Sequence, residues 1–281
     1  MADEHHGTWS TNFAGNIKRW APDSFKIFGR SAHRLDNRYV RWNTAAIIVG
    51  AGPSLANNIG YLRNVHRIGQ ARPGNRRGAL IYATDAALKP LLENDIRPDY
   101  VVALDEHVAT KRFYEGADTK GMGLLASITA YPEAIKDWQG QVWFWANGND
   151  NVYEDRAFFG FDKASLSLIP WVKAWTNSVS MMAVVLAQRA GIRDHYLIGC
   201  DYAVSNGRTH VDGFAVGPDD VFKDQETYHA DVMKAMSIHC DRLHRVYRRK
   251  HLPVWNCTEG GNLKWNNIPL EQAAQKFGFA K

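Results

Sequence analysis

Short apolar runs alternate with longer amphipathic segments along the chain from residue 45 onward. Apolar runs of four or five residues bounded by turn residues are typical of buried strands, and longer periodic segments are typical of helices. The runs predict strands at Ala45–Val49, Leu80–Ala83, Tyr100–Leu104, Leu124–Ile128, Val142–Trp145, His195–Gly199 and Pro253–Trp255. The segments between them predict helices at Ser54–Val65, Ala86–Asn94, Pro132–Trp138, Ser178–Ala190 and Glu226–His251.

This alternation indicates an α/β fold, a Rossmann-like doubly wound and mainly parallel sheet with helices on both faces. Residues 1–44 contain no clean strand, and their spaced aromatic residues predict an N-terminal helical lead-in. We therefore expect residues 45–281 to form a single Rossmann-like domain. Within it, the Gly- and Asp-rich stretch 202–223 is irregular and long enough to be a candidate lid.

The first predicted strand runs directly into a glycine turn. Glycines let a backbone approach a ligand closely, and the free N–H groups at the start of the following helix attract phosphate oxygens. The turn lacks both the third glycine of a dinucleotide fingerprint and the lysine of a P-loop, so a tight strand–helix turn explains it equally well. The candidate phosphate-binding residues are Gly50, Ala51, Gly52, Pro53 and Ser54.

Polar residues follow most of the other predicted strands. Thr84 and Asp85 follow the second, Asp105 the third, Asp201 the sixth and Glu259 the last. Ligands of open parallel sheets bind at the carboxyl ends of the strands, so these side chains share one edge. Several carboxylates beside a phosphate-binding turn suit Mg²⁺, although any single aspartate is also explained as a turn or helix-capping residue.

Two helix starts add candidates of the same kind. Asn177 and Ser178 precede a helix that is apolar on all sides, where they serve equally well as anion ligands or as caps. His229 begins the long C-terminal helix beside the candidate lid. A histidine there is a candidate general base, with an exposed first-turn histidine as the alternative.

Composition narrows the class of protein. A net charge of +5 and a pI near 9.0 suit an anionic ligand such as a nucleotide without requiring nucleic acid. Three widely spaced cysteines argue against a disulfide framework and a zinc site, and no apolar run is long enough to span a membrane. The aromatic residues fall mostly in strands, so we expect a cytoplasmic protein that binds small molecules rather than nucleic acid.

Four segments in order resemble the MptE-like family: Ile47–Leu55, Ala83–Asp105, Asn177–Asp201 and Asn256–Gly261. The namesake of that family is the archaeal 6-hydroxymethylpterin diphosphokinase, and its bacterial relatives include motility-associated factors linked to flagellin glycosylation. The resemblance runs from about residue 45 to residue 270. The segment from Asp85 to Asp105 is also similar to thiamin pyrophosphokinases.

The resemblance implies pyrophosphoryl transfer from ATP to a hydroxymethyl carbon of a small acceptor, with Mg²⁺. It implies that Asp85 and Asp105 hold metal or substrate, that Asp201 is a third acidic contributor, and that the glycine turn binds phosphate. Such a reaction needs metal-held phosphates and an aligned alcohol, with little covalent work from the protein. The chain departs from pyrophosphokinases at Glu106 and His107, where they tend to carry Asp-Ser.

A more distant resemblance is to bacterial sialyltransferases, which share the Gly-Pro-Ser turn and the pattern from Ser178 to Tyr202. It implies a CMP-sugar bound without metal and His229 as the base, but Ala51 and Asp85 stand where those enzymes favour asparagine. The leading hypothesis is thus a nucleotide-dependent diphosphokinase-like transferase. A glycosyltransferase and a non-catalytic nucleotide-binding module are the alternatives, and a homo-oligomer is left open.

Overall fold

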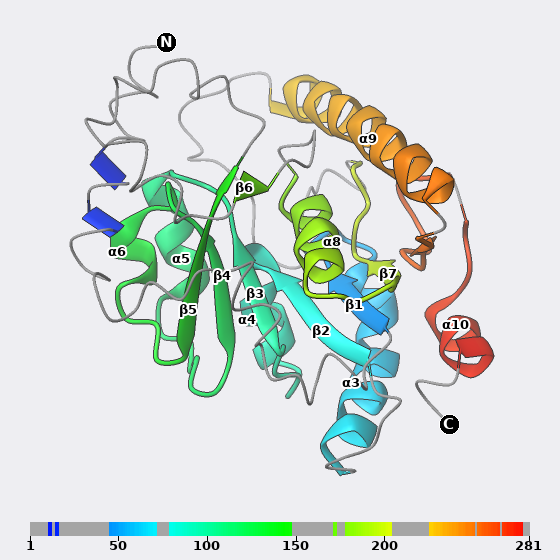
Figure 1. The fold of residues 1–281 in the computed structure, drawn as a ribbon, viewed down its shortest axis with the longest axis horizontal. Coiled ribbons are helices and arrows are strands. Elements are labelled where there is room, and N and C mark those ends of the chain that lie inside the picture. The colour runs from blue at the N-terminus through cyan, green and yellow to red at the C-terminus, as the bar shows by residue number, and fades with distance from the viewer. Residues whose placement is uncertain are drawn as a thin grey trace.

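The computed structural model of the chain describes residues 11–12, 15–16, 45–71, 79–147, 171–172, 178–203, 225–250, 252–264 and 266–277. These residues form one sheet with the strand order β6-β5-β4-β3-β2-β1-β7-β8, and every described strand pair is parallel (Figure 1). The strands are β1 (Ala45–Val49), β2 (Ala79–Thr84), β3 (Tyr100–Ala103), β4 (Gly123–Ser127), β5 (Gln141–Asn147), β6 (Trp171–Val172), β7 (Asp194–Ile198) and β8 (Val254–Asn256).

The helices lie between the strands along the chain, except for the last helix, which follows β8. They are α3 (Leu55–Ala71), α4 (Leu88–Leu92), α5 (Lys111–Tyr114), α6 (Pro132–Ile135), α8 (Val179–Arg189), α9 (Gln225–Arg249) and α10 (Leu270–Phe277). The predicted α/β fold with a Rossmann-like parallel sheet is therefore confirmed, and each predicted strand is present to within two residues at either end. The predicted helix Ala86–Asn94 is divided, because a 3₁₀ turn at Asp85–Ala87 precedes α4.

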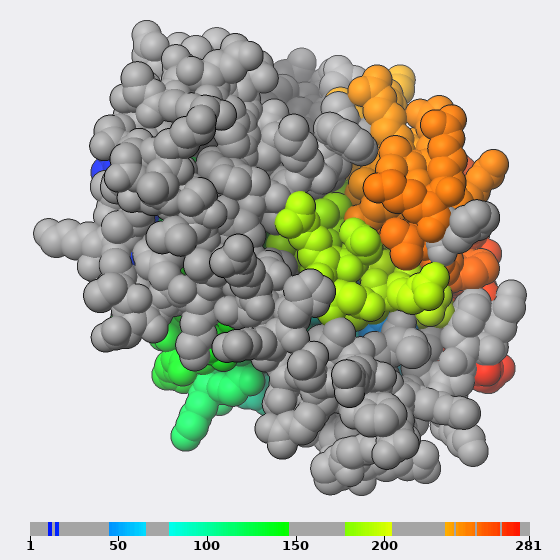
Figure 2. All heavy atoms as spheres, in the orientation of Figure 1, coloured from blue at the N-terminus to red at the C-terminus, as the bar shows by residue number. Residues whose placement is uncertain are grey.

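Alternate side chains of the strands enter two separate cores. Ala45, Ile47 and Val49 of β1 pack with residues of α3, α4, α5, α6 and α10 on one face of the sheet. Ala46 and Ile48 pack with residues of α8 and α9 on the other face. Figure 2 shows the side chains of α9, in orange, across part of the molecular surface in this view. Helices thus cover both faces, as the doubly wound pattern predicts.

The strand order reverses at β1. The chain passes from β1 outward through β2 to β6 and then returns to place β7 on the other side of β1. Val49 at the end of β1 is in register with Ala83 of β2 and with Ile198 of β7. The turns that leave these three strands therefore lie side by side at the carboxyl edge. Ligands of doubly wound sheets bind at such a reversal.

Little of the predicted lead-in 1–44 lies in the described part of the chain, but two helical pairs, 11–12 and 15–16, do. Asn12 and Asn16 are buried. The Asn12 amide donates to the carbonyl oxygens of Glu106 and Thr129, both at 3.1 Å. The Asn16 amide donates to those of Ile128 and Ala130. This segment is therefore attached beside the ends of β3 and β4.

Most of the predicted lid, 202–223, lies outside the described residues, which stop at Ala203 and resume at Gln225. Within the described ranges, no helix combines the length and the apolar character needed to cross a membrane. Cys200, Cys240 and Cys257 are buried and unpaired, and burial raises the pKa of each thiol to about 12.

Candidate functional site

The glycine turn after β1 packs directly against the turn after β7. The Gly50 N–H donates to the Ile198 carbonyl oxygen at 2.9 Å, and the Gly52 N–H donates to that of Gly199 at 2.7 Å. A Cβ on Gly50 would lie 2.4 Å from the Gly199 oxygen, and a Cβ on Gly199, whose φ is +60°, would lie 2.3 Å from the Gly50 oxygen. Close contact between two backbones therefore accounts for these glycines.

Asp201 lies at the N-terminus of α3. Its Oδ2 accepts hydrogen bonds from the Ser54 hydroxyl at 2.7 Å and from the Ser54 N–H at 3.3 Å. A Cβ on Gly52 would lie 1.9 Å from the same oxygen. Burial raises the pKa of Asp201, and the Ser54 hydrogen bonds partly offset that rise. A carboxylate of the protein itself thus occupies the position expected to attract phosphate.

The loop that follows β8 closes over Asp201. The Asn262 N–H donates to the Asp201 carbonyl oxygen at 2.8 Å. Gly261 has a φ of +72°, and a Cβ there would lie 2.1 Å from that carbonyl oxygen. In the same loop Glu259 is exposed, and it accepts a hydrogen bond at 3.1 Å from the Asn58 amide on the first turn of α3. The structure therefore brings two predicted site residues, Asp201 and Glu259, against the start of α3.

Ser178 takes part in a group of buried hydroxyls at the start of α8. The Ser178 and Ser180 hydroxyls are 3.0 Å apart, and both are hydrogen-bonded to the Tyr202 hydroxyl. Ser178 is the N-terminal cap residue of α8 by position, but its side chain makes no capping hydrogen bond. Its hydroxyl faces Tyr202 instead, so side-chain capping by Ser178 is wrong. Asn177 lies outside the described residues.

Asp85 is a buried carboxyl group, 4% exposed, at the end of β2. Its Oδ1 accepts a hydrogen bond from the Ala86 N–H at 2.9 Å, and the Tyr114 hydroxyl lies 3.5 Å from its Oδ2. Burial, with a smaller contribution from the nearby charge of Asp105, raises the pKa of Asp85 to about 7. Neighbouring Thr84 is also buried, and its hydroxyl has no hydrogen-bond partner among the residues that the structure describes.

Asp105 follows β3, the strand next to β2. Its side chain is exposed, and its Oδ1 accepts a hydrogen bond from the His107 N–H at 3.2 Å. Partial desolvation of the carboxyl and the nearby Glu106 raise the pKa of Asp105. The residues that depart from the pyrophosphokinase pattern, Glu106 and His107, therefore both act on Asp105 in this structure.

The fit to Mg²⁺ depends on how many carboxylates meet. Among the described residues, no three His, Cys, Asp or Glu side chains form a group that could hold a metal ion. Asp85, Asp105 and Asp201 are thus not a three-ligand site. Mg²⁺ commonly uses only one or two protein carboxylates and completes its shell with water and substrate phosphates. Asp85 and Asp105, which interact electrostatically, meet that smaller requirement.

Two further side chains border this pair and were not found from the sequence. Tyr114 belongs to α5, a four-residue helix too short to leave a periodic pattern. Asn12 contacts the backbone of Glu106, and its four-residue spacing from Asn16 is the one sequence signal of that contact. His229 lies in α9, but its side chain is outside the described part of the chain.

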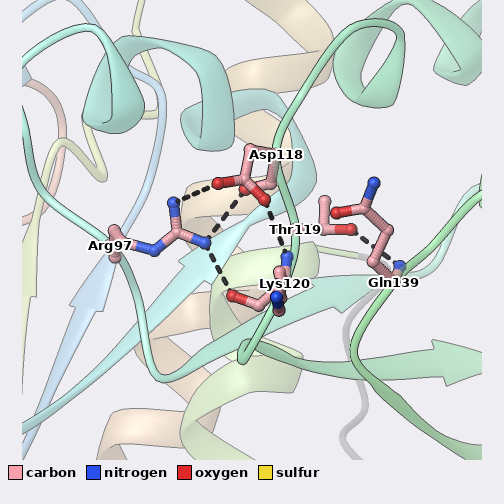
Figure 3. Close-up of polar contacts among 5 residues, drawn as sticks. All are labelled: Arg97, Asp118, Thr119, Lys120 and Gln139. Atoms are coloured by element: carbon pink, nitrogen blue, oxygen red, sulfur yellow. Dashed lines mark hydrogen bonds and ion pairs between the residues drawn. The ribbon is translucent and has the colours of Figure 1, made fainter.

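A pocket of about 760 Å³ lies at the opposite, amino edge of the sheet, between the segments that leave α4 and α5. There the Arg97 guanidinium is held by the Asp118 carboxylate at 3.1 Å and by the Lys120 carbonyl oxygen at 2.6 Å (Figure 3). Arg97 and Asp118, two of its charged lining residues, are thus paired with each other. The pocket shares no residue with the carboxyl-edge site.

The fold and the carboxyl-edge site define a Rossmann-like α/β protein whose candidate residues extend from the reversal of strand order at β1 and β7 to the ends of β2 and β3. The sequence model of the MptE-like family, described as 6-hydroxymethylpterin diphosphokinase MptE-like, matches residues 18–207, more than half of the chain. The chain therefore belongs to the MptE-like family. The match begins within the lead-in and ends before α9, whereas the ordered motifs of the sequence continue to about residue 270.

One similar solved structure is the MAf glycosyltransferase from Magnetospirillum magneticum AMB-1, with a TM-score of 0.62 and 21% sequence identity. The match covers 96% of this chain and 39% of that one, so this chain spans about two fifths of its length. At this identity the likeness shows the fold. No protein with a curated description matches the sequence significantly. Membership of the family supports a transferase of some kind.

Proposed function

We propose that the chain is a nucleotide-dependent transferase that moves a pyrophosphoryl group from ATP to a hydroxymethyl group of a small acceptor, with Mg²⁺ held by Asp85 and Asp105. The description of its family supports this reaction. The observation that carries the proposal is a buried carboxyl group, Asp85, beside a second carboxyl group and without an ion pair among the described residues. A buried charge of this kind is costly unless a cation offsets it.

The reaction places clear demands on this pair. The acceptor hydroxyl oxygen forms a bond to the β-phosphorus of ATP, the bond from that phosphorus to the α–β bridging oxygen breaks, and AMP leaves as the hydroxyl proton is lost. When bound, Mg²⁺ supplies positive charge to the phosphate oxygens. Asp85 and Asp105 would hold the metal through their carboxylate oxygens, and the hydroxyl proton would leave to solvent water.

Thermal melting tests the proposal. ATP with Mg²⁺ should raise the melting temperature by several degrees, because a ligand at a hundredfold excess over its Kd adds about 2.7 kcal/mol to the stability of the native state. EDTA and the substitution Asp105→Asn should each abolish the shift. Asp137→Asn, which removes an exposed carboxylate outside the site, is the matched control. A shift that survives both EDTA and Asp105→Asn would contradict the proposal.

A glycosyltransferase is the second candidate, because the fold likeness to the MAf glycosyltransferase extends over 96% of this chain. For that activity we expect stabilisation by CMP or a nucleotide-sugar in EDTA, and loss of turnover in His229→Ala. Such a metal-independent shift, without one from Mg²⁺ and ATP, would replace the diphosphokinase proposal. If no nucleotide shifts the melting temperature, a non-catalytic module explains the chain better than either transferase.

A further inference from the structure

The N-terminus of α3 already has an anionic ligand. A helix N-terminus presents unpaired N–H groups and a partial positive charge, which favour one anion. Here the Ser54 N–H and the Ser54 hydroxyl both donate to Asp201 Oδ2, at 3.3 Å and 2.7 Å. Asp201 comes from the turn after β7, 147 residues along the chain, so the contact is a tertiary one.

The Asp201 carboxylate is enclosed on both sides. A Cβ on Gly52 would lie 1.9 Å from its Oδ2, and a Cβ on Gly260 would lie 3.3 Å from its Oδ1. The residue is only 3% exposed, and the Asn262 N–H fixes its carbonyl oxygen at 2.8 Å. Moving this carboxylate away would require a shift of the loop after β8 as well as loss of both Ser54 hydrogen bonds.

A phosphate group bound by the same donors would have to lie beside this carboxylate. Two like unit charges about 4 Å apart at an effective dielectric constant near 20 disfavour binding by roughly a thousandfold. The glycine turn therefore disfavours phosphate, which distinguishes it from the carboxyl pair at the ends of β2 and β3. Among the described residues, the second location combines an exposed carboxylate, that of Asp105, with the buried hydroxyl of Thr84, which has no hydrogen-bond partner in that part of the chain.

We propose that Asp201 is a permanent internal ligand of the α3 N-terminus, and that it excludes the phosphates of a nucleotide from the glycine turn and leaves them to the ends of β2 and β3. The placement of the nucleotide phosphates at the ends of β2 and β3 rests on the proposed function. In this role Asp201 is a positioning residue: it joins the β1 and β7 turns and determines where an anion is able to bind.

Calorimetric titration with inorganic pyrophosphate in EDTA tests the exclusion directly. The wild-type protein should not bind pyrophosphate under these conditions. Asp201→Asn removes the charge and keeps an acceptor for Ser54, and it should bind pyrophosphate at least about tenfold more tightly than the wild type. Asp201→Ala is a second variant with the same expectation. Adding Ser54→Ala to either Asp201 variant should weaken the new pyrophosphate binding. Asp105→Asn alone should not create pyrophosphate binding.

Each result decides the inference. Wild-type binding of metal-free pyrophosphate that Ser54→Ala abolishes would show an open phosphate site at the turn and overturn it. Failure of both Asp201 variants to gain binding, with their helical circular dichroism intact, would also overturn it. These titrations contain no metal and therefore test the exclusion separately from the proposed function. A wild-type protein that does not bind Mg²⁺ with ATP would count against the proposed function alone.

Discussion

Asp85→Asn should make the protein more stable at alkaline pH while it removes a proposed metal ligand. The Asp85 carboxyl group is 4% exposed, and burial raises its pKa from 3.8 to about 7. Asparagine fills nearly the same volume, keeps an acceptor for the Ala86 N–H and carries no charge to desolvate. When replacing a residue stabilises the fold, the native residue is typically retained for function rather than for stability.

The size and sign of the effect follow from proton linkage. Because the pKa of Asp85 is higher in the folded state, the folded protein binds a proton between pH 3.8 and pH 7 that the unfolded chain does not. The contribution of Asp85 to the free energy of unfolding therefore falls as pH rises through this window, by about 1.4 kcal/mol per pH unit. The loss reaches about 4 kcal/mol at pH 8, and about 2.5 kcal/mol of it develops between pH 5 and pH 8.

Urea unfolding of the wild type and of Asp85→Asn at pH 5 and pH 8 measures this difference. The stability of the variant relative to the wild type should increase by about 2.5 kcal/mol between the two pH values. Asp137→Asn, at an exposed position, controls for the general effect of removing one carboxylate. A relative stability of Asp85→Asn that stays constant or decreases from pH 5 to pH 8 would refute the reasoning.

Three other perturbations probe the same edge and the core beneath it. Asp201→Ala leaves both Ser54 donors without an acceptor and should lower the free energy of unfolding in urea by about 1–3 kcal/mol. Asp201→Asn keeps an acceptor and should lower it clearly less. Equal losses in the two variants would contradict the hydrogen-bond account. Gly199→Ala places a Cβ 2.3 Å from the Gly50 oxygen at a φ of +60°, so it should lower the free energy of unfolding by several kcal/mol. An unchanged melting temperature would be incompatible with the turn contact. His195 is fully buried, and burial lowers its pKa to about 4, so its own contribution to stability should fall by about 3 kcal/mol as pH drops from 6.5 to 4. The stability of His195→Leu relative to the wild type should therefore rise by about that amount over this range in urea unfolding, and a constant difference would argue against His195.

The strands were predictable because each central strand is buried on both faces and reads as a continuous apolar run. Ala45–Val49, for example, is buried at every position and was predicted with its exact bounds. β6 has two residues and leaves no such run. α10, with buried Leu270, Ala273 and Ala274, is amphipathic but was not assigned. Short elements take their conformation from the sheet they join, which a local pattern does not record.

The edge that carries the candidate residues was also predictable, because the carboxyl ends of parallel strands meet at one edge. The pairing of side chains at that edge was not. Asp201 contacts Ser54 because β7 lies beside β1, although β7 comes after five other strands along the chain. Sequence order alone does not give strand order, so it does not separate Asp201 from Asp85 and Asp105. The nucleotide and the metal remain predictions.

The mutual contact of the β1 and β7 turns has a consequence for the divergence of related sequences. Gly50 and Gly199 each occupy the space that the other's Cβ would need, and Gly52 stands in the same relation to the Asp201 side chain. A substitution at one of these positions is tolerable only if its counterpart yields room. Positions 50, 52, 199 and 201 should thus vary together in an alignment of the family, and this covariation would identify neighbouring strands that lie about 150 residues apart in the chain.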